Sequence, residues 1–92
     1  MNMHAYSDVW DALADTPEQA EGIKIRSDLM MAINDHLEKT NGARTMTAQQ
    51  LGITQPRLND LLQGRIGNFS LDALIIIAVN AGLKVSVHAK AA

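Results

Sequence analysis

Apolar residues recur at helical spacing along most of this chain and predict a series of helices. The longest helix is expected over residues 17–39. Thr16 as its cap, Pro17 at its first position and Gln19 three residues after the cap together form a strong start signal. Its expected buried face consists of Ile25, Leu29, Ala32, Ile33 and Leu37.

Three shorter helices are expected over residues 43–51, 55–63 and 71–81. Ser70 is placed to cap the last of them, and Gly82 to end it. Residues 83–88 then alternate strictly between apolar and polar side chains, which predicts a short strand. The expected fold class is therefore all-α with a C-terminal strand.

The pattern divides the chain into an arm, one helical domain and a tail, over residues 1–15, 16–82 and 83–92. In the arm, Val9, Trp10 and Leu13 predict a short helical turn that Trp10 anchors to the domain. The chain has 92 residues, of which 47% are hydrophobic, so it can bury one small core. It has no cysteine, which excludes disulfides and thiolate metal sites.

Neither a secretory leader nor a membrane span is expected. The first residues lack a basic segment followed by an apolar one. The longest apolar run, residues 73–79, is far shorter than the roughly 20 residues that cross a bilayer. We therefore expect a soluble protein, and the absence of cysteine fits the reducing cytoplasm.

The charge is polarised along the chain. Residues 1–38 hold two basic and eight acidic side chains, whereas residues 39–92 hold six basic and two acidic ones. The net charges are thus −6 and +4, and the positive part coincides with the short central helices. The alternative is that eighteen charges fall into unequal halves by chance, with no functional meaning.

The segment from Arg44 to Gly64 predicts a helix-turn-helix. Two helices that cross closely need a small residue at the crossing, which Ala48 supplies. A tight reversal favours a positive φ and therefore glycine, which Gly52 supplies. The second helix of such a motif can lie in the major groove of DNA, and sequence-specific DNA binding is the leading hypothesis.

The polar side of the second helix carries groups that bind base edges. Glutamine and asparagine can bond adenine, and arginine can bond guanine, in bidentate fashion. The expected base-reading residues are Gln55, Arg57, Asn59 and Gln63. The expected backbone contacts come from Arg44, Thr54 and Arg65. Asp60 either accepts from a cytosine amino group or holds Arg57 or Arg65 in place.

The helix after Ser70 is apolar on nearly every face, which predicts a shared interface in a short chain. We expect a symmetric homodimer that binds a palindromic operator. Its expected contact residues are Leu74, Ile75, Ile77, Ala78, Val85 and Val87. The alternative is a monomer with this helix at the centre of its own core.

The run QQLGITQPRLNDLLQGRIGNFSLDALIIIAVNAGLKVSV resembles the Xre/Cro-like domains of HigA-type antitoxins and related transcriptional regulators. The resemblance extends from Val9 to Val87. It implies a five-helix, lambda-repressor-like bundle, dimeric operator binding and autoregulation beside a RelE-like toxin. It also places the DNA-reading positions on Thr54, Gln55, Arg57, Asn59 and Gln63, while Arg44 departs from the glutamine common at its position.

An enzyme is not expected, and no cofactor or metal is expected either. His4, His36 and His88 are scattered without metal-ligand spacing, and no nucleophile or carboxylate pair stands in a catalytic pattern. The rival hypothesis is a protein-interaction module, in which the acidic residues 8–38 face a basic RelE-like toxin and DNA binding is secondary or lost.

Overall fold

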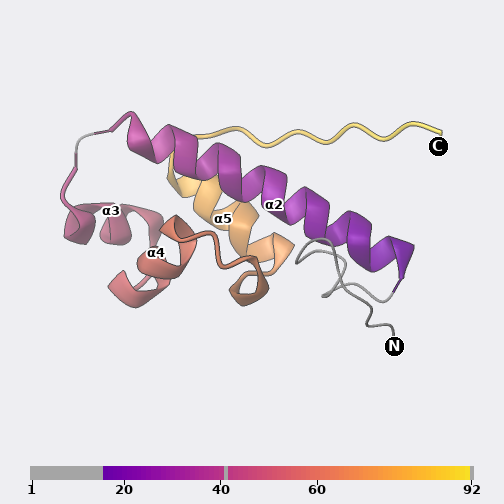
Figure 1. The fold of residues 1–92 in the computed structure, drawn as a ribbon. Coiled ribbons are helices and arrows are strands. Elements are labelled where there is room, and N and C mark those ends of the chain that lie inside the picture. The colour runs from indigo at the N-terminus through magenta and orange to yellow at the C-terminus, as the bar shows by residue number, and fades with distance from the viewer. Residues whose placement is uncertain (1–15, 41, 92) are drawn as a thin grey trace.

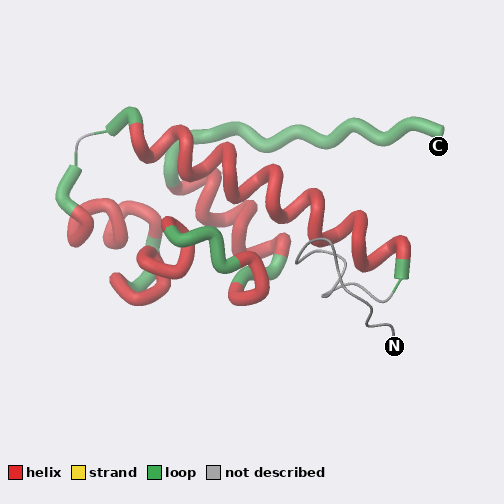
Figure 2. The backbone as a smooth tube through the Cα atoms, in the orientation of Figure 1, coloured by secondary structure: helices red, strands yellow, loops and turns green. Residues whose placement is uncertain are grey.

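The computed structural model describes residues 16–40 and 42–91, and this part of the chain folds as α-helices with one 3₁₀ turn (Figures 1 and 2). The elements are α2 (Pro17–Glu38), α3 (Arg44–Leu51), α4 (Gln55–Leu62), η1 (Ile66–Asn68) and α5 (Leu71–Asn80). The four α-helices confirm the four predicted after Thr16, and each differs from its predicted range by one residue at one end. The fifth expected helix, around Trp10, lies outside the described residues.

Side-chain caps explain where three of these helices begin. A hydroxyl oxygen of the residue before each helix accepts a hydrogen bond from a free amide of the first turn. The bonds run from Gln19 N to Thr16 Oγ1 at 3.1 Å, from Arg57 N to Thr54 Oγ1 at 3.2 Å and from Ala73 N to Ser70 Oγ at 3.1 Å. Helix starts are thus determined by residues that are neighbours in the sequence.

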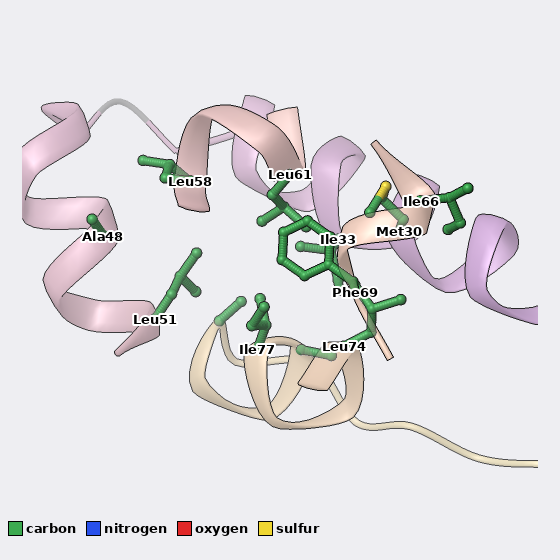
Figure 3. Close-up of a cluster of buried hydrophobic side chains, with 12 residues drawn as sticks. Met30, Ile33, Ala48, Leu51, Leu58, Leu61, Ile66, Phe69, Leu74 and Ile77 are labelled. Carbon is green, nitrogen blue, oxygen red and sulfur yellow. The ribbon is translucent and has the colours of Figure 1, made fainter. Parts of the chain in front are cut away.

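The core lies where α2, α4 and α5 meet (Figure 3). Ile33, Leu61 and Leu74, one from each helix, have no exposed surface. Phe69, which follows η1, is 3% exposed and fills the same cluster. The arrangement sets α3 and α4 at the end of the molecule where α2 stops (Figure 1).

The buried face of α2 differs from the predicted one. Ile23 and Met30 join Ile33 inside, whereas Ile25 is 44% exposed. Of the other expected positions, Leu29 and Leu37 are half-buried and Ala32 is exposed. The cause is that apolar residues occur on several faces of α2, so their spacing alone does not select the face that meets α5, η1 and α4.

The structure also corrects the expected role of α5. Leu74, Ile77 and Ala78 were expected at a dimer interface, but each is at most 2% exposed and packs in the core of its own chain. The large apolar side chains that α5 leaves most exposed to solvent are Ile76 and Val79, at 60% and 57% exposure, and Leu71 at its start is 37% exposed. A second copy could therefore contact this outer face, whereas the inner face is already covered.

The tail after α5 is extended, and no strand is present among residues 16–40 and 42–91 (Figure 2). Leu83 N donates to Ala78 O at 2.9 Å, and Leu83 and Val85 pack against the core. Val87 is 85% exposed. The strand expected over residues 83–88 is therefore wrong for the single chain, because a strand needs a hydrogen-bonded neighbour and the described residues provide none.

Candidate nucleic-acid interface

The turn between α3 and α4 has the conformation that a helix-turn-helix requires. Gly52 ends α3 with a φ of 74°, in the left-handed region that favours glycine. The amide of Ile53 donates to the carbonyl oxygen of Ala48 at 3.0 Å and closes the end of α3. Ala48 is 2% exposed, so its small side chain lies inside the motif.

A residue distant in the sequence supports this turn. Asn80, the last residue of α5, donates from Nδ2 to the carbonyl oxygen of Leu51 at 3.1 Å. Its own carbonyl oxygen accepts a bond from Gln50 Nε2 at 3.4 Å. The end of α5 therefore holds the end of α3, and the sequence pattern contained no sign of this contact.

Two further side chains tie α2 to the rest of the fold. Asn34 Nδ2 donates to the carbonyl oxygen of Leu61 at 2.9 Å, so α2 is bonded to the backbone of α4. His36 Nε2 lies 2.9 Å from the carbonyl oxygen of Ala81, which assigns the proton to that ring nitrogen. His36 is half-buried between helices and acts as a structural residue.

Helix α4 has an inner and an outer face. Leu58 and Leu61 point into the core and are at most 1% exposed. Leu62, the next apolar residue of α4, is 36% exposed and lies at the edge of this inner face. The carboxamides of Gln55, Asn59 and Gln63 are exposed, and the last two lie one and two turns beyond the first. Of these three predicted base-reading residues, Gln55 and Asn59 therefore lie on the outside of α4, and Gln63 continues the row at the C-cap.

The carboxamides are held in place by weak bonds of their own. Gln55 Nε2 donates to Thr45 Oγ1 at 3.3 Å, which links the first turn of α4 to the first turn of α3. Gln63 Nε2 donates to Asn59 Oδ1 at 3.5 Å. Each amide group keeps donors and acceptors for a further partner, since an amide offers two hydrogens and two lone pairs.

Arg57, the fourth predicted base reader, lies on the flank of α4 against the loop of residues 65–69. Its Nη1 donates to the carbonyl oxygen of Asn68 at 2.9 Å. Its guanidinium carbon lies 4.4 Å from the centre of the Phe69 ring, a cation–π contact. Arg57 is half-buried, unlike the three carboxamides.

Asp60 joins the same loop from the next turn of α4. Its Oδ1 accepts from Arg65 Nη1 at 3.3 Å, and its Oδ2 accepts from Asn68 Nδ2 at 3.2 Å. Of the two roles open from the sequence, the structure shows the one in which Asp60 holds Arg65. Arg65, predicted to contact phosphate, remains more than half exposed at 57%.

The other two predicted backbone contacts, Arg44 and Thr54, lie at helix N-termini. Arg44 is the exposed first residue of α3. Thr54 is exposed and caps α4, so its hydroxyl is already bonded to the first turn of that helix. Amides in the first turns of helices carry partial positive charge, which suits contact with phosphate.

Charge separates these helices from α2. Residues 44–69 carry three arginines and one acidic residue, Asp60. Helix α2 exposes five carboxylates, from Glu18, Glu21, Asp28, Asp35 and Glu38. Only one of them, Asp28, lies within ion-pair distance of a cation among the described residues, at 3.9 Å from Lys24. A polyanion is therefore attracted to α3 and α4 and repelled by α2.

A family model described as a helix-turn-helix domain matches residues 12–90. The chain belongs to this helix-turn-helix domain family. No curated protein matches its sequence. In the part of this helix-turn-helix domain that the structure describes, no helix combines the length and apolarity needed to cross a membrane.

Sequence reasoning missed several residues that shape the interface of this helix-turn-helix domain. Thr45 and Asn68 bond two of the predicted DNA contacts, and Asn80 supports the turn. None of them gave a local signal in the sequence, because each bonds a residue ten or more positions away, across a loop or between helices.

Proposed function

We propose that this helix-turn-helix domain is a sequence-specific DNA-binding transcriptional regulator whose α4 enters the major groove. The observation that carries the proposal is the exposed row of carboxamides at Gln55 and Asn59 on α4 and Gln63 at its C-cap. A surface helix meant only for solubility usually carries glutamate and lysine on its outer face, and α4 carries neither. Arg44 at the start of α3 and Arg65 in the loop after α4 would bind phosphates, which would fix the position of α4 on the duplex.

The double variant Gln55→Ala/Asn59→Ala is expected to bind operator DNA about tenfold or more weakly, because each bidentate base contact contributes about 1–3 kcal/mol. The measurement is an electrophoretic mobility shift with the DNA upstream of the protein's own coding sequence, at low salt. Gln19→Ala is the matched control. It removes an exposed carboxamide from the first turn of α2, at the end of that helix that lies away from α3 and α4 (Figure 1). No retardation by the wild-type protein would overturn the proposal.

We further propose that the regulator works as a homodimer through the outer face of α5 and the tail. Ile76 and Val79 are exposed there, and Ile75 adjoins them. This face continues into a groove of about 290 Å³ between α2, α5 and the tail, lined by Ile25, Leu71 and Val87 among others. A two-fold axis at this face would set two copies of α4 on a palindromic operator about one DNA turn apart.

Sedimentation equilibrium should give a mass near twice the 10.0 kDa of one chain, and Ile76→Asp/Val79→Asp should give the mass of one chain. Burying two carboxylates in an apolar interface is unfavourable. Met31→Asp, which places a carboxylate on an exposed apolar position of α2, should leave the dimer intact. A wild-type protein that is monomeric at all concentrations would contradict the dimer.

The resemblance to HigA-type antitoxins supports a narrower role, that of an autoregulating antitoxin. The five exposed carboxylates of α2 favour a basic protein, such as a RelE-like toxin, as a second partner. The rival function is neutralisation of that toxin without operator binding. Copurification with a small basic protein encoded beside the gene, together with no DNA retardation, would favour the rival.

A further inference from the structure

Arg57 is bonded within the protein in a way that conflicts with reading a base. A guanine contact uses two parallel N–H donors of the guanidinium, directed outward into the groove. In the structure one terminal nitrogen donates to the carbonyl oxygen of Asn68, and the guanidinium lies over Phe69. Moving Arg57 into the groove would break the hydrogen bond and uncover a ring that is 3% exposed.

The loop of residues 65–69 is bonded to two residues of α4 that lie about one turn apart on the same side of the helix. Arg57 bonds the backbone of Asn68, and Asp60, three residues further along α4, bonds the side chains of Asn68 and Arg65. Residues three apart lie on the same side of a helix. Arg57 and Asp60 therefore form one flank that fixes the loop and its exposed Arg65 beside α4.

Base reading is then left to the carboxamides. Gln55, Asn59 and Gln63 follow one another at four-residue intervals, which spans about 12 Å along the helix axis. At about 3.4 Å per base pair this length covers three to four successive pairs. A carboxamide presents one donor and one acceptor side by side, the complement of the N7 and amino group of adenine.

We propose that Arg57 is a positioning residue that fixes the loop of residues 65–69, and that α4 reads adenines through its carboxamides instead of a guanine through arginine. This proposal rests on the proposed DNA-binding function. It assigns the class of half-site: A·T pairs where Gln55, Asn59 and Gln63 meet the major groove, without a guanine specified by Arg57.

The test is selection of bound duplexes from a pool with a randomised 20-base-pair segment, using wild type, Arg57→Met, Arg57→Lys and Asn59→Ala. The duplexes that the wild-type protein selects should be enriched in adenines within each half-site. Arg57→Met should bind them about tenfold more weakly because the loop is released, yet select the same sequences. Arg57→Lys, which keeps a donor and a charge over Phe69, should restore most of the affinity. Asn59→Ala should lose the preference at one base pair of each half-site.

Two controls separate positioning from loss of folding or charge. Circular dichroism at the binding temperature must show each variant folded, so that lower affinity with unchanged base preference reports the position of the loop. Lys24→Met removes one positive charge from α2 and should change neither the sequences nor the affinity by more than about twofold.

The outcomes distinguish the two proposals. If Arg57→Met or Arg57→Lys loses a guanine from the selected half-site while its other bases persist, Arg57 reads that base and the inference is wrong although the protein binds DNA. Half-sites rich in guanine and without adenines would overturn the inference in the same way. If no sequence is enriched by the wild-type protein, the proposed function itself fails, and the inference with it.

Discussion

Leu61→Ala is expected to lower the free energy of unfolding by about 2–5 kcal/mol. The Leu61 side chain has no exposed surface and lies among residues of α2, α4 and α5 (Figure 3). Alanine would leave a cavity at the point where these helices meet. Because small domains are stable by only about 5–15 kcal/mol, the loss is a large fraction of the total.

Thermal denaturation followed by circular dichroism measures this loss, at about 4–8 °C in Tm per kcal/mol for a domain of this size. Leu62→Ala is the matched control, since it removes the same side chain from the next residue, which is 36% exposed. Its loss should be less than half as large. Equal losses for the two variants would mean that Leu61 is not the buried member of the pair.

The second large effect is expected for Gly52→Val, which should lower the free energy of unfolding by about 2 kcal/mol or more. A left-handed conformation costs an L residue about 1–2 kcal/mol, and a β-branched residue more. The new Cβ would also lie 3.5 Å from Asn80 Nδ2, in ordinary contact, so the branches beyond it would press on the group that bonds Leu51. Urea denaturation measures the change.

Alanine variants separate backbone strain from crowding. Gly52→Ala adds only Cβ and should retain the strain without the branches. Gly67→Ala is the control, because Gly67 has no positive φ and a Cβ there meets no atom within 4 Å among the described residues. It should keep the stability of the wild type. Gly52→Val with wild-type stability would show that the turn tolerates side chains and would contradict the positive φ.

The elements that could be predicted from the sequence are those determined by neighbouring residues. Thr16, Thr54 and Ser70 each cap a helix by bonding an amide three residues later, and all three helices begin where expected. Gly52 is a similar case, since the need for a positive φ belongs to one residue. Such interactions leave a pattern within a few positions of the chain.

The orientation of the apolar helices could not be predicted in the same way. On α5 the apolar residues surround the helix, so spacing did not show that Leu74 and Ile77 face inward while Ile76 faces outward. The packing partner decides this, and it is a property of the assembled fold. The tail shows the same limit, because alternation indicates an extended chain but not whether another strand lies beside it.

The contacts of the candidate interface were hidden because they join distant residues. The bond from Arg57 to Asn68 spans 11 positions, and the bond from Asn80 to Leu51 spans 29. Neither follows from helical period or turn chemistry. The sequence indicated which side chains α4 could offer to DNA, but not that Arg57 is already engaged by the loop.

The division of α4 into two faces also has a consequence for how such a protein can change over evolution. Leu58 and Leu61 hold the helix in the core, whereas Gln55, Asn59 and Gln63 are exposed and lie outside the core. If α4 reads DNA as proposed, mutations at these three outer positions would alter the preferred DNA sequence while the packing stays intact. A lineage, or a protein engineer, would then redirect this domain to a new DNA sequence without first having to stabilise it.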